Sequence, residues 1–167
     1  LLTKLPNYNF ISINRSGCIY LPNVKKLYKN NSKEFDNCTL SSKNKIDEYI
    51  NSKKNSIIII GGEFHKHLNK NEEEWKYKSI NNKTIKENFK VSLINILSEN
   101  KVILVYPIPS VNFDITKRIM NEIPKNTFKA TEYLIQNPFT TNYSDYINEN
   151  NEVINFFNNI NHKNLLK

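Results

Sequence analysis

The residues that could do chemistry gather behind one apolar stretch. Gly61, Gly62, Glu63 and Phe64 follow four consecutive isoleucines, Ile57–Ile60. A continuous apolar run bounded by polar residues is typical of a parallel strand covered on both faces. Loops at the carboxyl ends of such strands converge on a crevice, and glycine lets the backbone approach a ligand closely. We therefore expect the Gly61 to Phe64 loop to form part of any active site. The alternative interpretation is an ordinary strand and turn.

Two histidines follow this loop and raise the question of a metal. His65 and His67 lie two positions apart, and with Glu63 they have side chains of the type that binds zinc. No further ligand set has matching spacing, so we expect neither a metal nor a cofactor. His162, near the end of the last expected helix, is best explained as a charge that complements the helix dipole.

A search for catalytic motifs finds none. The Gly-x-Ser-x-Gly elbow, the P-loop and the GxGxxG fingerprint are all absent. Ser16 precedes a glycine but lacks the strand-to-helix context of a nucleophile. Asp114 and Glu122 are interpreted as a helix cap and a solvent-exposed charge rather than an acid/base pair. The residues alone therefore predict a crevice without a catalytic set.

The two cysteines, Cys18 and Cys38, leave two possibilities open. Neither belongs to a CxxC pair, which argues against a metal site. They could close one loop as a disulfide, which would imply an oxidising compartment. They could equally be two unrelated buried thiols, as in a cytosolic protein.

The net charge of +8 does not indicate nucleic-acid binding. The lysines are spread along the whole chain, and specific readers of nucleic acid favour arginine, of which there are only two, Arg15 and Arg118. Abundant Lys and Asn indicate a bias in genome composition. No stretch is long and apolar enough to span a bilayer. The chain begins with neither Met nor a signal peptide, so we expect it to be a piece of a longer protein, with any membrane anchor or export signal outside this piece.

The expected elements alternate between strands and helices. We expect strands at 9–13, 57–60 and 101–106, an irregular stretch at 23–40 with a helical turn around 24–28, and a loop at 63–82. Helices are expected after a Ser41–Ser42 cap with Ile46, Tyr49 and Ile50 on one face, at 83–99 after an Asn82 cap, from Asp114 to Met120, and at 144–160. This order predicts an α/β fold with a parallel sheet and helices on both faces, in a single domain spanning residues 1–167.

Three blocks in this order resemble a known family. They are Gly17-Cys18-Ile19-Tyr20-Leu21-Pro22-Asn23, then Ile57-Ile58-Ile59-Ile60-Gly61-Gly62-Glu63-Phe64, then Val102-Ile103-Leu104-Val105-Tyr106-Pro107-Ile108-Pro109-Ser110-Val111-Asn112-Phe113-Asp114. Together they resemble the SGNH-hydrolase-type domain of integral-membrane O-acyltransferases, which modify surface polysaccharides such as the O-antigen of lipopolysaccharide. The third block is the most specific, and the resemblance covers roughly residues 9 to 160.

The resemblance implies a fold and a chemistry. The fold is a flavodoxin-like, three-layer αβα sandwich, and the chemistry is acyl transfer through a serine acyl-enzyme. The Gly-Asp-Ser-His and Asp-x-x-His blocks that supply the nucleophile and the base do not occur in this chain, so we expect no catalytic residue in it. What carries over by position is the oxyanion region, the loops at Gly17–Cys18 and at Gly61 to Phe64. Where the family has Gly-x-Asn, this chain reads Gly62-Glu63-Phe64, without the amide donor.

The resemblance also implies a location and partners. A domain on the outer side of the bacterial inner membrane lies in the periplasm, which favours a Cys18–Cys38 disulfide. The partners would be an acyl donor and a glycan acceptor, reached through the membrane acyltransferase domain of the parent protein, without insertion of this segment into the membrane. Two alternatives stay open. One is a non-catalytic glycan-binding or scaffold module on the same fold, and the other is a cytoplasmic flavodoxin-like nucleotide-binding domain with free thiols.

Overall fold

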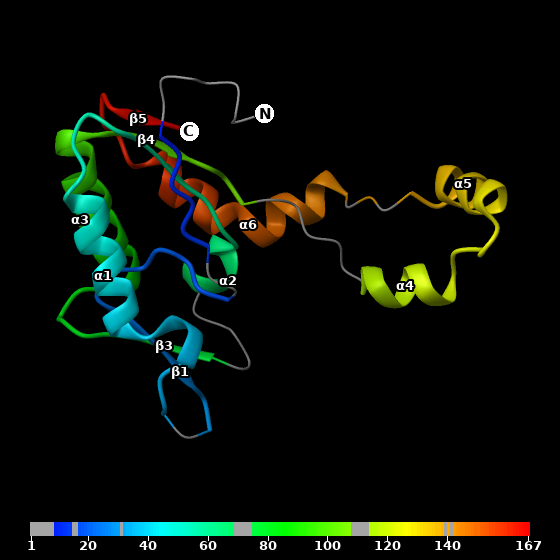
Figure 1. The fold of residues 1–167 in the computed structure, drawn as a ribbon, viewed down its shortest axis with the longest axis horizontal. Coiled ribbons are helices and arrows are strands. Elements are labelled where there is room, and N and C mark those ends of the chain that lie inside the picture. Colours follow the sequence, from blue (N-terminus) through cyan, green and yellow to red (C-terminus); the bar gives the residue numbers. More distant parts are fainter. Residues whose placement is uncertain are drawn as a thin grey trace.

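A parallel three-stranded sheet lies at the centre of the protein. The computed structural model describes residues 9–14, 17–30, 32–68, 75–107, 114–138, 140 and 142–167. Strands β2 (Ile57–Ile60), β4 (Lys101–Leu104) and β5 (Leu165–Leu166) pair in the order β2-β4-β5. Strand β2 runs parallel to β4 in the register Ile57↔Lys101 through Ile60↔Leu104. The predicted parallel pairing of the two apolar strands, and with it the α/β class, is confirmed (Figure 1).

Two long helices cover one face of this sheet. Helix α3 (Ile85–Glu99) buries the predicted apolar stripe, and α6 (Tyr143–Asn158) adds Val153 and Phe157. Fully buried side chains meet here from both strands and helices: Ile60, Phe64, Phe89, Leu93, Ile96, Leu97, Val102, Leu104, Val153, Phe157 and Ile160. The Phe64 ring lies edge-on to Phe89 and Phe157, with centroids 5.4 and 5.1 Å apart. Burial of each such side chain contributes about 1.5–3 kcal/mol to folding.

The other face of β2 is open among the described residues. Ile57 is 55% exposed and Ile59 is 62% exposed, whereas Ile60 is buried. Successive side chains of a strand point to opposite faces, so these two isoleucines lie on the side away from α3. The prediction that all four isoleucines are covered on both faces is therefore wrong for this face. An uninterrupted apolar run cannot distinguish a strand with two covered faces from one whose second face is left for another segment.

The helices begin close to where the sequence predicted, but two of the three predicted capping residues are wrong. Helix α1 (Leu40–Asn51) is capped by Thr39, whose hydroxyl accepts from the Ser42 N–H at 3.3 Å, so the predicted Ser41–Ser42 cap is wrong by two residues. Helix α3 begins with a capping box of Thr84 and Glu87 rather than at Asn82. The Asp114 cap of α4 (Ile115–Asn121) is confirmed, since its carboxylate accepts from the Lys117 N–H at 2.9 Å.

A second, two-stranded sheet was missed. Strands β1 (Val24–Tyr28) and β3 (Trp75–Ser79) pair antiparallel where the sequence predicted a helical turn and a loop. In the sequences Val-Lys-Lys-Leu-Tyr and Trp-Lys-Tyr-Lys-Ser, lysines obscure the alternation of apolar and polar residues that marks a strand. Lys26 is only 3% exposed, and its ammonium lies over the rings of Phe35 and Tyr77, so it takes a core position that its polarity conceals.

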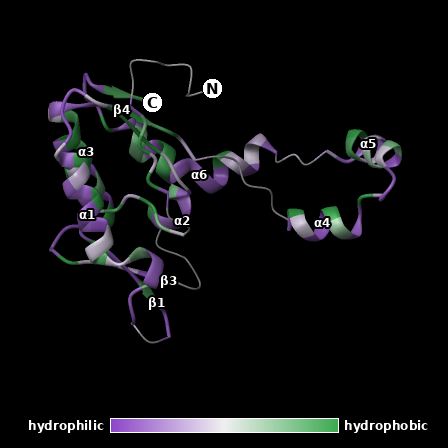
Figure 2. Ribbon diagram, viewed as in Figure 1, coloured by the Kyte–Doolittle hydropathy of each residue, from purple (hydrophilic) through white to green (hydrophobic). Residues whose placement is uncertain are grey.

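The remaining elements are short or lie apart from the sheet. The 3₁₀ helix η2 (Asp36–Cys38) precedes α1, and α2 (Phe64–Leu68) follows the β2 loop. Helix α4 and the unpredicted helix α5 (Thr127–Gln136) form an arm that bears no buried residue (Figure 1). Apolar and polar residues alternate along this arm (Figure 2). None of the described helices has the length and apolar character needed to cross a membrane.

The segment 9–14 does not form the predicted strand. It has no regular secondary structure, and Phe10, Ile11 and Ile13 are exposed. It lies alongside β2 without pairing to it (dark blue in Figure 1), and both line the same cavity. The residue types suited a strand, but a strand exists only where a neighbour supplies its hydrogen bonds.

Candidate functional site

A cavity of about 670 Å³ lies beside β2, between residues 9–14 and 17–21, helix α1 and the loop after the strand. Isoleucines from three parts of the chain line its length, and the loops at Gly17–Cys18 and Gly61–Glu63 lie at one end. Five of the six residues singled out from the sequence thus share one cavity: Gly17, Cys18, Gly61, Gly62 and Glu63. Phe64 does not line it, because its ring is fully buried in the aromatic core on the covered face.

The two loops at this end touch, and glycine is what allows it. A Cβ on Gly62 would lie 2.8 Å from Cγ2 of Ile19, closer than side chains tolerate. Gly17 has φ +66°, in the left-handed region that disfavours other residues. A Cβ on Gly61 would lie 3.3 Å from Cβ of Val105. The glycines therefore bring the backbone of both loops to the mouth of one cavity.

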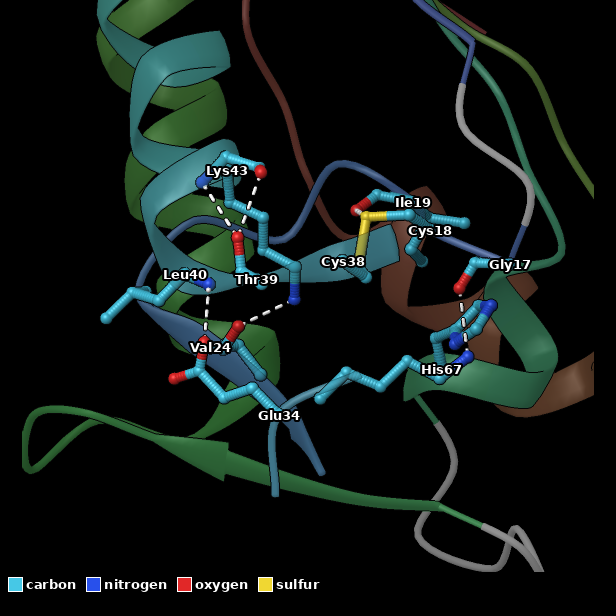
Figure 3. Close-up of a disulfide and its surroundings, with 12 residues drawn as sticks. Gly17, Cys18, Ile19, Val24, Glu34, Cys38, Thr39, Leu40, Lys43 and His67 are labelled. Carbon is cyan, nitrogen blue, oxygen red and sulfur yellow. Dashed lines mark hydrogen bonds between the residues drawn. A yellow bond between two sulfur atoms is a disulfide. The ribbon is translucent and has the colours of Figure 1, made fainter. Parts of the chain in front are cut away.

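A disulfide holds one wall of the cavity. Cys18 and Cys38 are bonded, with their Cα atoms 5.3 Å apart (Figure 3). The bond joins the Gly17 loop to η2, directly before the Thr39 cap of α1. Because α1 supplies the facing wall through Lys43, Ile46, Tyr49 and Ile50, the disulfide sets the spacing of two cavity walls.

Three buried basic side chains stand behind the Gly17 loop. Lys43 and His67 line the cavity at 4% and 5% exposure, and Lys26 lies close by. The Lys43 ammonium donates to the Val24 carbonyl at 2.6 Å, and the Lys26 ammonium donates to the Gly17 carbonyl at 2.9 Å. The bond from Lys26 holds the backbone of the Gly17 loop in place. Figure 3 shows Lys43 and His67 on either side of the disulfide.

Burial lowers the pKa values of Lys43 and His67. Loss of solvation, and then the charge of Lys26, lowers the pKa of Lys43 to about 8. Loss of solvation and the nearby lysines lower the pKa of His67 to about 3. His67 is therefore neutral at pH 7, and its Nδ1 is hydrogen-bonded to the Tyr77 hydroxyl. Sequence reasoning considered His67 only as a metal ligand, and it missed Lys26 and Lys43 because nothing in a lysine-rich sequence marks which lysines are buried.

The residues considered for metal binding or catalysis have other roles. Glu63 is ion-paired with Lys66 at 3.0 Å, and no group of three His, Cys, Asp or Glu side chains among the described residues could hold a metal. His65 has a lowered pKa, chiefly through burial, and its Nδ1 is buried without a partner among the described residues. His162 accepts from the Asn164 N–H. Glu122 pairs with Arg118, and Ser16 lies outside the described residues.

The described residues form a parallel α/β fold with a cavity along β2, and the loop at the carboxyl end of that strand closes one end of the cavity. The model of the SGNH domain that is fused to AT3 domains matches residues 2–166. The chain therefore belongs to this family, and it is a module associated with acyl transfer by a membrane acyltransferase domain. No curated protein and no solved structure matches the chain.

Proposed function

We propose that residues 1–167 are a single SGNH-like domain fragment of a membrane O-acyltransferase. In the intact parent this domain would transfer an acyl group such as acetyl to a cell-surface glycan on the periplasmic side of the inner membrane. The match over residues 2–166 is the observation that carries the proposal. The cavity beside the glycine loops supports it, because acyl transfer needs a crevice in which backbone N–H groups can approach an oxyanion.

The disulfide supports the periplasmic side. Disulfides persist in oxidising compartments and are rare in the cytosol. The Cys18–Cys38 bond therefore argues against the cytoplasmic nucleotide-binding alternative, which requires free thiols. Titration of thiols in denatured, unreduced protein taken from its native cells, with free thiols blocked at lysis, would test this, and two free thiols per chain would favour the alternative.

The chemistry of the parent protein would depend on groups that this chain does not supply. The family's serine and Asp-His blocks have no counterpart in the sequence, so the contribution of these residues is the pocket and its loops. Glu63 is exposed and ion-paired, and the Phe64 ring is in the core, so neither side chain stands in for the amide donor of the family pattern. Backbone N–H groups of the loops are the donors that remain.

The proposal is tested in the parent protein. Deleting its gene should remove base-labile acyl groups from the surface polysaccharide, and the wild-type gene should restore them. Gly62→Ala should restore them poorly, since its methyl group would collide with Ile19. Leu166→Ala, an exposed position on the opposite edge of the sheet, is the control and should restore them fully. Unchanged polysaccharide after deletion would refute the proposal.

The isolated chain gives a second measurement. We expect it to hydrolyse p-nitrophenyl acetate no faster than buffer, because removal of a nucleophile and base leaves little beyond binding. Serine-dependent turnover would show that a hydroxyl in this chain had been overlooked.

A non-catalytic glycan-binding module is the second candidate. The Gly62-Glu63-Phe64 sequence favours it, since the side chain expected to bind an oxyanion is missing. This candidate predicts that the parent protein binds the glycan. It also predicts that the polysaccharide keeps its acyl groups when the gene is deleted.

A further inference from the structure

The arm formed by α4 and α5 has no core of its own. Helix α4 has 7 residues and α5 has 10, and neither buries a side chain against the described parts of the chain. Isolated helices shorter than about 12 residues are marginal in water, because most helical stability in proteins comes from the packing of an apolar face. The Tyr133 hydroxyl of α5 donates to Glu122 at 3.1 Å, and Glu122 is ion-paired with Arg118 of α4. These polar contacts join the two helices but leave their apolar side chains uncovered.

The arm carries the most exposed apolar side chains of the described residues. Met120, Phe128 and Ile135 are 75%, 79% and 76% exposed. Only one other large apolar side chain of the described residues, at the start of α6, is exposed to the same extent. Figure 1 shows the arm extending away from the sheet and the helices that cover it. Apolar surface is therefore concentrated where the body of the protein does not reach it.

The residues of α5 are sorted by type around the helix axis. The half-buried Tyr133 lies on the side that contacts α4. Phe128 and Ile135, seven positions apart, share a second stripe, and Lys129 and Glu132, three positions apart, share a third. Adjacent apolar and charged stripes of this kind are typical of helices that lie in the plane of a membrane interface.

The charges of the arm suit an anionic lipid surface. Two of its three carboxylates are engaged, one as the cap of α4 and one in the ion pair with Arg118. Lys117, Lys125 and Lys129 form no ion pair with the described residues. A lysine beside an apolar stripe can bury its stem and still hold its ammonium at the level of lipid phosphates. The net charge of +8 on the whole chain adds a general attraction to anionic lipid.

Family membership brings a bilayer within reach of the arm. The chain belongs to the SGNH domains that are fused to AT3 domains, so in the parent protein it is tethered to a membrane domain. A tether raises the effective concentration of the surface, so weak binding is enough to keep the arm on it. The arm is inserted between β4 and α6, and β4 runs parallel to β2. The connection to the arm therefore leaves the sheet at the edge where the Gly61 loop lies.

We propose that the α4–α5 arm is an interfacial membrane-binding element. Met120, Phe128 and Ile135 enter the boundary between the headgroups and the acyl chains of an anionic bilayer, and the neighbouring lysines contact lipid phosphates. The contact is peripheral, since neither helix has the length and apolar character needed to cross a membrane. Seating of the arm would hold the sheet edge with the Gly61 loop beside the bilayer. This inference goes beyond the proposed acyl transfer and stands whether or not the parent has that activity.

Binding to vesicles tests the apolar stripe. The chain is mixed with vesicles of equal parts phosphatidylcholine and phosphatidylglycerol, and the bound fraction is measured by co-sedimentation. Phe128→Gln combined with Ile135→Gln should lower the partition coefficient at least tenfold. Ile80→Gln combined with Leu166→Gln removes two exposed apolar side chains from the body and should lower it less than twofold. Circular dichroism establishes that both double variants remain folded, and equal losses in the two would overturn the proposal.

A second measurement separates insertion of the arm from adsorption of a basic protein by charge. Phe128→Trp and Leu166→Trp each add a tryptophan to a chain that has one. Vesicles with bromine on the lipid acyl chains should quench the added fluorescence of Phe128→Trp at least twofold more than that of Leu166→Trp. Equal quenching would mean adsorption by charge alone and would overturn the proposal. A lipid-free dimer, seen by sedimentation velocity and abolished by Phe128→Gln with Ile135→Gln, would assign this surface to a second copy and overturn it as well.

Discussion

The two faces of strand β2 carry the same residue type, isoleucine, but they differ in how much of it is buried. Ile60 is buried against the aromatic core that α3 and α6 cover, whereas Ile59, its neighbour, is 62% exposed beside the cavity. One side is held by dense packing and the other by a disulfide and buried cations. The difference teaches that apolar composition specifies a strand, while the neighbours decide whether each side stabilises the fold or remains available for binding.

The largest expected effect compares these adjacent isoleucines directly. Ile60→Ala should lower the free energy of unfolding by about 2–5 kcal/mol, because it leaves a cavity in the packed core. Ile59→Ala should cost about 1 kcal/mol or less, the value of a lost β-branched residue on an exposed surface. Chemical denaturation of both variants measures the difference. Equal losses would mean that the open side is covered in solution.

Removal of the disulfide should have the second largest effect on the free energy of unfolding. Replacing both Cys18 and Cys38 by serine should lower the free energy of unfolding by about 3 kcal/mol, the chain-entropy value for a loop of this length. The separation of 20 residues encloses β1, so amide exchange should rise there more than in α3. Reducing agent should destabilise the wild type and leave the double variant unchanged. An equal response of both proteins to reductant would contradict this assignment.

The buried histidine predicts a smaller, pH-dependent effect. The pKa of His67 is lowered from 6.5 to about 3 in the folded state, so between these values the unfolded chain binds the proton that the folded chain excludes. Stability is present in full above pH 6.5 and falls on acidification toward pH 3, by up to about 1.4 kcal/mol per pH unit from this group.

Substituting His67→Gln should flatten that acid slope. Denaturation midpoints between pH 7 and pH 4 give the slope, and NMR of the imidazole gives the protonation directly. A His67 ring that titrates near pH 6.5 in the folded protein would show that the group is hydrated, and the burial argument would fail.

Sequence reasoning predicted the parts of this fold in which pattern and environment agree. The stripe of α3, the parallel partners β2 and β4 and the Asp114 cap all follow from local periodicity or capping chemistry. Strands β1 and β3 did not, because a lysine at a core position looks the same in sequence as a lysine in solvent. Helix α5 was not predicted, and none of its residues is buried among the described parts of the chain.

The candidate site, like the fold, was predictable only in part. Gly17, Gly61 and Gly62 were recognisable because glycine at the end of an apolar run marks a turn or a close backbone approach, and the structure places all three in one cavity. Lys26 and Lys43 were not recognisable. Their roles depend on carbonyls at Gly17 and Val24 that are far from them in sequence, and no single-chain pattern encodes a contact of that kind.

The arm formed by α4 and α5 has a consequence for how this chain can vary. Since neither helix buries a side chain, substitutions, shortening or proteolytic nicking between residues 115 and 136 should leave the unfolding temperature of the remainder unchanged. Packing among the described residues therefore places no constraint on Met120, Phe128 or Ile135, which are exposed apolar side chains on this arm.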